Sequence, residues 1–322
     1  MDNLTHSLVG VLLSKSGLGR VSKCSHGTLL CVVAANAPDL DIVTGLVSPA
    51  LYLAYHRHLT HSLYAIPLMA LVAVALTHWV HAGWRRVRRR PAAPPGSFWW
   101  EWLVAALVGT THPLLDWTNA YGTRLWLPFS NAWNYGDLLF IIDLIVWAIL
   151  VIATTGAWRF RKFGIRIAAA GLLVLTLYIA SNEIWRRRVV RFAQSQTYAG
   201  AAPLEVGAYP APGTPLDWIA YARTEQAQFT SSVNAWALDS LNETIRHAPP
   251  ANQAAIDAAK GSRLGGAYSN FARYPVQQVA QADGKTQVTL ADARFFRGET
   301  PVFSCVISLD DALKVLTEQF KF

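Results

Sequence analysis

The sequence predicts a mainly α-helical, polytopic membrane domain followed by a soluble α+β domain. Of the 322 residues, 52% are hydrophobic and only 15% are charged, which departs strongly from an average soluble protein. Long apolar stretches fill the first half of the chain, whereas the later part is polar and mixed. We therefore expect a helical transmembrane domain over residues 1–184, a linker over 185–216 and an extracytoplasmic α+β domain over 217–322.

Two short apolar segments and four long ones follow one another along the membrane domain. Segments 4–13 and 28–38 reach only about half of the ~30 Å hydrocarbon layer at 1.5 Å per residue. They predict half-depth helices that are buried in protein or face a watery cavity. A full span needs roughly 20 apolar residues. The stretches that predict transmembrane helices are residues 62–82, 99–118, 138–157 and 165–181.

Basic residues predict how these spans are oriented. Five arginines between Arg85 and Arg90 follow one span directly, and a second basic run, 159–166, separates the last two spans. Both fit cytoplasmic loops under the positive-inside rule, so the net charge of +8 is explained by topology and we expect no nucleic-acid partner. The run 186–191 breaks this rule on the outer side, where anionic lipid headgroups or an anionic substrate would explain it.

The later part of the chain predicts a small α+β domain. Four prolines between Pro203 and Pro215 mark an irregular linker. Its alternating and periodic apolar residues predict strands at 218–221, 287–290 and 302–307, with helical pieces at 251–272 and 309–319. The domain carries no motif of its own, so capping the site, binding a partner and stabilising the fold all stay open as its role.

A repeated Thr-His pair is the clearest chemical signal. Thr5-His6, Thr60-His61 and Thr111-His112 each adjoin an apolar segment, and aspartates lie close to the same boundaries. With the basic loops inside, these histidines fall on the outer membrane face. Ionisable residues within a membrane are costly and usually functional. The pattern therefore predicts a metal site.

Two pairs of residues begin the expected ligand set. His112 and Asp116 are four residues apart in an apolar helix, so both project from one face. Asp39 and Asp41 follow Pro38 at the end of the second short segment, where a capping turn is the alternative explanation. Asp39 is favoured as a ligand, and Asp41 is expected either to orient a ligand or to bind another ion.

The loop before the third apolar segment holds three histidines in six residues, and neutral imidazole is a common zinc ligand. Arg57 in this loop offers a planar fork that can hold a phosphate group. Asp137 and Asp143 are expected to be either ligands or partners that orient a histidine. The metal ligands that we expect are His6, Asp39, Asp41, His56, His61, His112, Asp116, Asp137 and Asp143.

Four other histidines and the three cysteines are expected to be structural. His78 and His81 lie at the opposite, cytoplasmic end, and His26 and His247 lack acidic company. The cysteines Cys24, Cys31 and Cys305 show no metal-binding spacing.

In this order, the motifs resemble the YdjM-like family, formerly DUF457, of bacterial inner-membrane proteins described as predicted membrane-bound metal-dependent hydrolases. The matching segments are residues 2–10, 37–41, 56–63, 111–116 and 135–143. One departure is His58, where a small residue such as glycine is usual, so His58 is not counted as a ligand. The resemblance covers roughly residues 1–180 and implies a helical membrane fold with metal-dependent hydrolase activity.

The ligand order also looks like that of zinc-dependent phospholipase C and P1-type nucleases, helical enzymes that bind three zinc ions through His and Asp. His6, Asp39, His61, His112 and Asp116 stand in a similar order here. This likeness implies two or three divalent ions, Zn²⁺ with Mn²⁺ as the alternative, and hydrolysis of a phosphoester.

Together these observations predict a multi-pass, metal-dependent phosphoester hydrolase of the bacterial inner membrane. The expected substrate is a lipid or other amphiphile, such as a phospholipid or an isoprenoid phosphate, whose tail stays in the bilayer. We expect catalytic roles for Arg57, which would hold the phosphate, and for Asp41 or Asp137, which would receive a proton from the attacking water. A metal-ion transporter and a structural membrane protein held together by metal are the alternatives, and the oligomeric state is left open.

Overall fold

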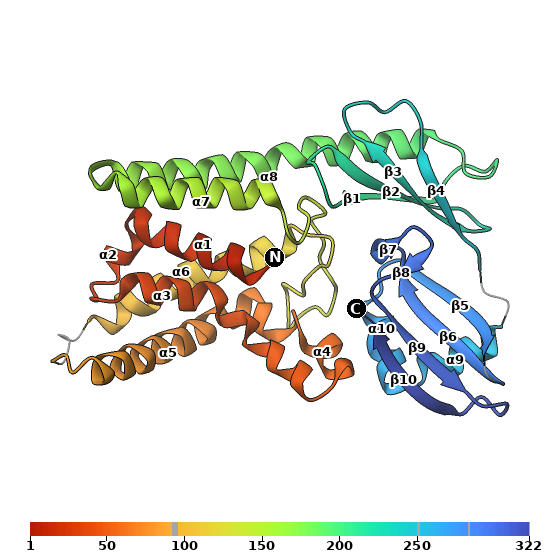
Figure 1. The fold of residues 1–322 in the computed structure, drawn as a ribbon, viewed down its shortest axis with the longest axis horizontal. Helices are drawn as coiled ribbons and strands as arrows, with labels where there is room; N and C mark the ends of the chain where they lie inside the picture. Colours follow the sequence, from red (N-terminus) through yellow and green to blue (C-terminus); the bar gives the residue numbers. More distant parts are fainter. Residues whose placement is uncertain (92–95, 250–251, 283, 322) are drawn as a thin grey trace. The chain divides into compact units, whose positions relative to one another are not determined.

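The computed structural model describes residues 1–91, 96–249, 252–282 and 284–321, and the chain forms two compact units (Figure 1). The helical unit comprises Met1–Asp41 and Arg57–Trp185. The second unit comprises Ile42–His56 and Arg186–Phe322. Each unit is described by itself.

The helical unit is built from short helices at its beginning and longer ones after them (Figure 1). A π-helical segment, Ser14–Leu18, follows α1, and a 3₁₀ segment, Ala37–Leu46, continues α3. Short 3₁₀ turns, Leu59–His61 and Leu63–Ala65, lead into α5. The helices are α1 (Asn3–Leu13), α2 (Gly19–Val21), α3 (Gly27–Asn36), α5 (Ile66–Val87), α6 (Phe98–Trp117), α7 (Leu144–Arg159) and α8 (Gly164–Ser195), the last of which continues into the second unit.

Two apolar cores hold these helices together. In one core, Leu30 and Ala34 of α3 pack with Ala73 of α5 and Val104 of α6, all of them almost fully buried. In the other, Leu12 of α1 packs against α7 and α8 through neighbours such as Val146 and Leu150. Helix α1 therefore lies between both cores, and its position fixes the residues at its N-terminal end.

Gly10 allows α1 to lie close to α3. A Cβ atom at this position would lie 2.7 Å from the Cys31 carbonyl oxygen and 3.0 Å from the Ala35 Cβ. A larger residue must push the two helices apart, and overpacking of this kind costs about 2 kcal/mol.

We predict that Gly10→Val lowers the free energy of unfolding by about 2 kcal/mol, the cost of overpacking a close helix contact. Thermal unfolding in detergent, followed by intrinsic tryptophan fluorescence, measures the change. Gly83→Ala in α5 is the matched control, because no atom lies within 4 Å of the added Cβ. It should leave the melting temperature unchanged or raise it slightly. Equal destabilisation by both substitutions would contradict the close α1–α3 contact.

Three segments of the described residues are long and apolar enough to cross a membrane: Gly27–Leu46, Leu63–Val87 and Arg161–Ser195. Two of them correspond to the expected spans 62–82 and 165–181. The expected spans 99–118 and 138–157 form helices, but α6 is not among these three segments and α7 is a shorter apolar helix.

The short helix expected at 28–38 corresponds to α3, and the 3₁₀ segment that follows continues it to a 20-residue apolar segment, so its depth in the membrane stays a prediction. The sequence indicated a stop at Pro38, but a proline fits into the first turn of a new helical segment. Exposed tryptophans at one end of α5 and α6, including Trp79 and Trp99, suit a membrane interface.

The second unit contains two four-stranded antiparallel sheets. One sheet has the order β1 (Glu205–Pro210), β2 (Asp217–Arg223), β3 (Gln228–Asn234) and β4 (Asn242–His247). The other has the order β10 (Val315–Lys321), β9 (Ser304–Leu309), β6 (Lys285–Asp292) and β5 (Pro275–Ala282). A small ribbon pairs β7 (Phe296–Arg297) with β8 (Thr300–Pro301). The helices are α4 (Pro49–Tyr55), α9 (Gln253–Lys260) and α10 (Arg263–Phe271), and α4 packs against α10.

The sheets expected in the C-terminal region are confirmed, with two differences in the elements around them. Residues 186–195 of the expected linker continue α8, and β1 also falls within that linker. Residues 315–321 form β10 where a helix was expected. Residues 315–321 form a strand because they pair with β9. A helical pattern in the sequence does not reveal a neighbouring strand.

A buried ion pair fixes one end of β6. Burial alone would raise the pKa of Asp292, but the Arg294 guanidinium, 2.7 Å away, and backbone N–H groups hold that pKa below its usual range. Asp292 therefore stays ionised and ties β6 to the 3₁₀ turn that follows it.

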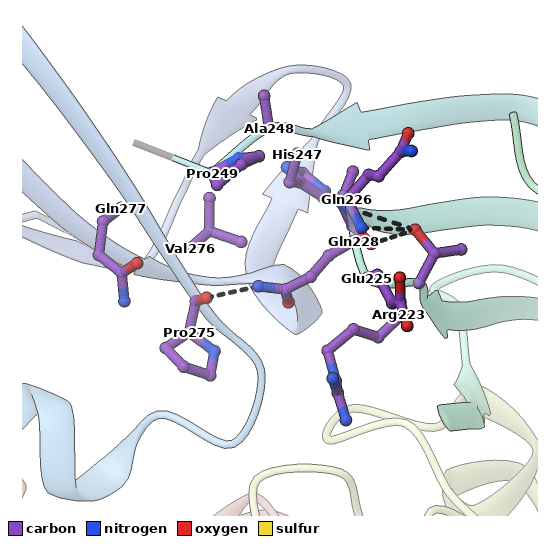
Figure 2. Close-up of a pocket in the computed structure, with 12 residues that line it drawn as sticks. Arg223, Glu225, Gln226, Gln228, His247, Ala248, Pro249, Pro275, Val276 and Gln277 are labelled. Carbon is purple, nitrogen blue, oxygen red and sulfur yellow. Dashed lines mark hydrogen bonds between the residues drawn. The ribbon is translucent and has the colours of Figure 1, made fainter. Parts of the chain in front are cut away.

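A cavity of about 210 Å³ in this unit lies beside the turn between β2 and β3 and the start of β5 (Figure 2). Its polar groups pair with each other, since Gln228 Nε2 donates to the Pro275 carbonyl at 2.8 Å. Among the described residues, no group of three or more metal-binding side chains lies wholly within this unit.

Candidate metal centre

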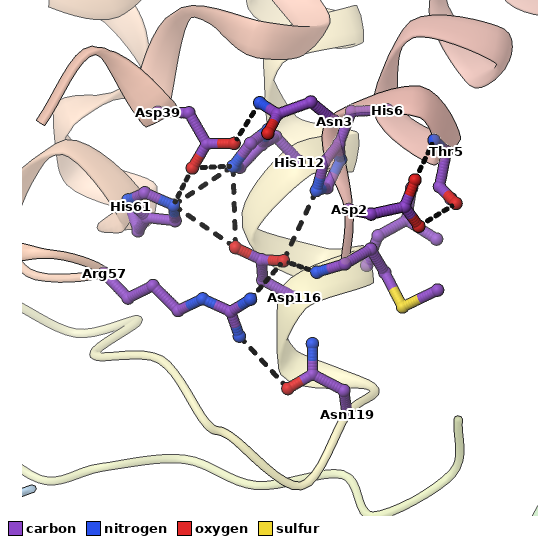
Figure 3. A network of polar contacts seen from close by, with 12 residues as sticks. Asp2, Asn3, Thr5, His6, Asp39, Arg57, His61, His112, Asp116 and Asn119 are labelled. Carbon is purple, nitrogen blue, oxygen red and sulfur yellow. Dashed lines mark hydrogen bonds and ion pairs between the residues drawn. The ribbon is translucent and has the colours of Figure 1, made fainter. Parts of the chain in front are cut away.

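Four side chains of the helical unit point one donor atom each toward a common centre (Figure 3). His61 Nε2 lies 3.3 Å from Asp39 Oδ1 and 3.2 Å from Asp116 Oδ2. His112 Nε2 lies 3.4 Å and 3.5 Å from the same two oxygens, and the two Nε2 atoms are 3.0 Å apart. Three of the four side chains are almost fully buried, and Asp39 is 11% exposed.

These distances suit a single tetrahedral cation. Zinc binds imidazole nitrogen and carboxylate oxygen at about 2.0–2.1 Å, so the edges of its coordination tetrahedron measure about 3.3–3.4 Å. The five distances above range from 3.0 to 3.5 Å. Five of the six edges therefore lie within a few tenths of an ångström of the tetrahedral values.

The outer ring nitrogens of His112 and His61 both have acceptor oxygens beside them. His112 Nδ1 lies 2.7 Å from the Ala35 carbonyl oxygen, which can only accept, so Nδ1 must carry the proton. His61 Nδ1 lies 3.2 Å from Asp41 Oδ2, which favours a proton on that nitrogen as well. In neutral rings both Nε2 lone pairs then face each other at 3.0 Å. A cation between them removes this repulsion, and such outer contacts are typical of metal-binding histidines.

The three carboxylates around His61 also favour positive charge on its ring. Burial alone would lower its pKa, but contacts with Asp116, Asp39 and Asp41 raise it to about 10. The carboxylates thus stabilise a proton on this ring, and a metal ion competes with that proton for the same site.

Local structure explains how each ligand reaches the centre. Asp39 lies in the first turn of the 3₁₀ segment after α3, and Asn3 Nδ2 donates to its Oδ2 at 2.8 Å, which turns Oδ1 inward. His112 and Asp116 are one turn apart on α6, which continues through Pro113 to Trp117. His61 ends the 3₁₀ turn Leu59–His61.

Asp41 holds His61 from outside the centre. Its Oδ2 accepts hydrogen bonds from Thr60 Oγ1 at 2.6 Å and from the Arg57 backbone N–H at 3.2 Å, in addition to its contact with His61. These contacts fit a partner that orients a ligand, which is one of the two roles expected for Asp41.

His6 and Arg57 lie on the other side of Asp116. The His6 ring stacks on His112 with 3.7 Å between centroids, and its Nε2 lies 3.4 Å from Asp116 Oδ1. Neither ring nitrogen of His6 has a hydrogen-bond partner. Arg57 Nη2 lies 3.3 Å from the same Oδ1, which also contacts the Met1 amino nitrogen.

Further contacts hold Arg57 in this position. Its Nη1 donates to Asn119 Oδ1 at 3.0 Å, and the guanidinium lies over the Tyr121 ring. The backbone of Arg57 has a φ of +59°, a left-handed conformation that non-glycine residues rarely adopt and that clusters at functional sites.

Three other expected ligands are not members of this group of four. Asp143 caps α7, since its Oδ1 accepts from the Ile145 and Val146 backbone N–H groups and its Oδ2 accepts from Tyr178. Asp137 is buried and precedes Leu144, where α7 begins. His56 belongs to the second unit, where it stacks on Tyr52.

Sequence analysis missed Asn3 and Thr60, which hold Asp39 and Asp41. Their positions offered a signal. Asn3 precedes His6 by three residues on one helix face, and Thr60 precedes His61 directly.

Comparison with known proteins supports the helical unit. A family model described as YdjM inner membrane protein matches residues 1–189. A Bacillus subtilis (strain 168) protein described as "Uncharacterized protein YfhP" is 27% identical over 185 residues, which are 56% of this chain and 51% of the relative. The chain thus matches about half the length of that curated relative. No solved structure matches this chain.

Proposed function

The chain belongs to the YdjM inner membrane protein family, and on this basis we propose that it is a membrane-bound, metal-dependent hydrolase of an amphiphilic phosphoester. The observation that carries the proposal is the convergence of Asp39, His61, His112 and Asp116, with the two imidazole Nε2 atoms 3.0 Å apart. A bound cation would stabilise the buried carboxylates of this cluster, in addition to the positive charge that Arg57 and the Met1 amino group bring to Asp116. We place it at the outer face of the inner membrane, as the basic loops favour.

A divalent cation held by these four residues would have to expand its coordination to admit water, and it would then supply Lewis-acid activation of that water and of a phosphoryl oxygen. The surrounding residues divide the remaining work. Arg57, buried beside Asp116, neutralises an anionic phosphoryl group. His6, whose Nε2 lies 3.4 Å from Asp116 Oδ1, is the imidazole beside the centre that would receive a proton. Asp41 keeps His61 in its binding tautomer.

An apolar groove beside the metal centre supports a lipid-like substrate. The cavity, of about 470 Å³, has the size of a small-molecule site. It is lined by one face each of three helices: Val9 and Leu13 of α1, Thr111, Leu114, Leu115, Trp117 and Thr118 of α6, and Leu172, Leu175, Thr176 and Ile179 of α8.

The groove offers an apolar ligand no competing hydrogen bonds. The hydroxyls of Thr111, Thr118 and Thr176 donate to carbonyl oxygens of their own helices. On α6, Thr111 and Leu115 directly precede His112 and Asp116, so adjacent faces of one helix serve the groove and the metal centre. An alkyl chain in the groove would place its phosphoester head near the cation.

Metal removal tests this proposal. Purified full-length protein is stripped with a chelator, reloaded with Zn²⁺ or Mn²⁺, and assayed against labelled phospholipids and prenyl phosphates. We expect headgroup or phosphate release to be lost on stripping and restored by reloading.

Release that is unaffected by stripping would overturn the metal-dependent reaction. Metal uptake into sealed liposomes without any hydrolysis would favour a transporter instead. Bound metal that raises the melting temperature but supports neither activity would favour a structural role.

A further inference from the structure

A second group of metal-binding side chains lies at the other end of the helical unit. Cys24 and His26 occupy the loop between α2 and α3, and Glu101 lies in the first turn of α6. One donor atom from each lies within 4.8 Å of the others. His78 of α5 adds a fourth side chain, because its Nε2 lies 2.6 Å from Glu101 Oε2 and its ring lies 5.0 Å from that of His26.

Protein contacts alone leave this group incompletely satisfied. Glu101 is only 1% exposed, although it is a carboxylate. Both ring nitrogens of His26 are buried without a hydrogen-bond partner. The ion pair with His78 accounts for Glu101, but it does not explain why an unpaired imidazole and a thiol gather beside it. Unpaired buried polar atoms are costly, so a missing partner is the simplest explanation.

The backbone is also shaped around this group. A Cβ atom at Gly96 would clash with Glu101 Oε1 and would lie 3.1 Å from the Cys24 Cβ. A larger residue at this position would have to displace the end of the Glu101 side chain and would press on Cys24.

We propose that Cys24, His26, Glu101 and His78 bind a second metal ion, of the zinc class. Thiolate, imidazole and carboxylate are the three ligand types that Zn²⁺ accepts, and four of them complete a closed tetrahedral site. Such a site ties the loop before α3 to α5 and α6.

The two sites are too far apart to share an ion. Glu101 and Asp116 lie fifteen residues apart on α6, or about 22 Å at 1.5 Å per residue. The core between them contains apolar side chains such as Leu30, Ala73 and Val108. The second site therefore binds its metal independently, and it does not rest on the proposed hydrolase function.

Sulfur distinguishes the two sites in one experiment. Only the second site contains a thiolate, so Co²⁺ bound there gives a sulfur-to-cobalt charge-transfer band in the near ultraviolet, whereas Co²⁺ at the His/Asp site does not. Full-length protein in detergent is stripped, titrated with Co²⁺ and followed by absorption, with bound metal measured per chain. We expect the band in the wild type. Cys24→Ser should lose the band and should bind one metal ion per chain fewer than the wild type.

Matched variants complete the test. Cys31→Ala and Cys305→Ser should keep the charge-transfer band. His112→Ala should bind one metal ion per chain fewer but should also keep the band. If Cys24→Ser does not fold, Glu101→Gln and His26→Gln take its place. Each should weaken Co²⁺ affinity, measured by titrating the charge-transfer band, at least tenfold. A wild type without the band, or a band that persists in a folded Cys24→Ser variant, would overturn the second site.

Discussion

Asp116→Asn should abolish metal binding at the first site and lower hydrolysis by more than a hundredfold. Asp116 is the hub of the cluster: its Oδ2 faces His61 and His112, and its Oδ1 faces His6 and Arg57. Loss of a residue that merely orients a ligand costs about 10–100-fold in metal affinity or activity. Loss of a ligand itself should cost more. Bound metal per chain and initial rates of phosphate release measure both effects.

Asparagine keeps the size of the side chain but replaces one carboxylate oxygen by an amide nitrogen, which cannot bind a cation. Circular dichroism should therefore show unchanged helix content. Asp143→Asn is the matched control, because Asp143 caps α7 and asparagine also caps helices well. It should keep metal and activity. Metal loss in Asp143→Asn, with full occupancy in Asp116→Asn, would reverse the assignment.

Local spacing explains why part of the metal centre could be predicted from the sequence. His112 and Asp116 share one helix face, so their proximity needs no knowledge of the fold. Asp39 and His61 stand at the ends of apolar segments, and the alternation of membrane segments brings such ends together. Their convergence with His112 nevertheless depends on how α3 and α6 pack, which the structure shows.

The remaining residues depended on contacts that spacing does not encode. Asp143 was expected near the metal, but its position directly before α7 makes it a helix cap. His26 was expected to lack acidic company, and this is wrong because Glu101 lies beside it in space. The two residues are 75 positions apart, so only the packing of α3 and α6 reveals the pair.

The helical fold was predicted better than its boundaries. Apolar length found all four long helices, but it cannot tell a membrane span from a buried helix of similar composition. Helix α6 shows the difficulty, since its Glu101 and His112 serve polar clusters at its two ends. Functional residues thus lower the hydropathy of a helix that the core still requires.

Thr176→Trp should block the groove and lower kcat/KM for long-chain substrates by about a hundredfold. Thr176 is exposed and lines the groove, and its hydroxyl bonds only to its own helix at Leu172. Tryptophan exceeds threonine by the volume of about four methylene groups, each of which contributes ~0.8 kcal/mol when buried. Excluding that length of alkyl chain removes about 3 kcal/mol of binding, or a factor of about a hundred.

A chain-length series separates this effect from a general loss of activity. Short-chain phosphoesters do not reach the groove, so Thr176→Trp should hydrolyse them at the wild-type rate, with metal content unchanged. Leu173→Trp is the matched control, because Leu173 lies on α8 within one turn of Thr176 but is 59% exposed and does not line the groove. It should leave both classes unaffected. If Thr176→Trp slows short and long substrates equally, the groove does not hold the alkyl chain. Because the cation would still be bound, this result would reject the lipid specificity but not the metal centre.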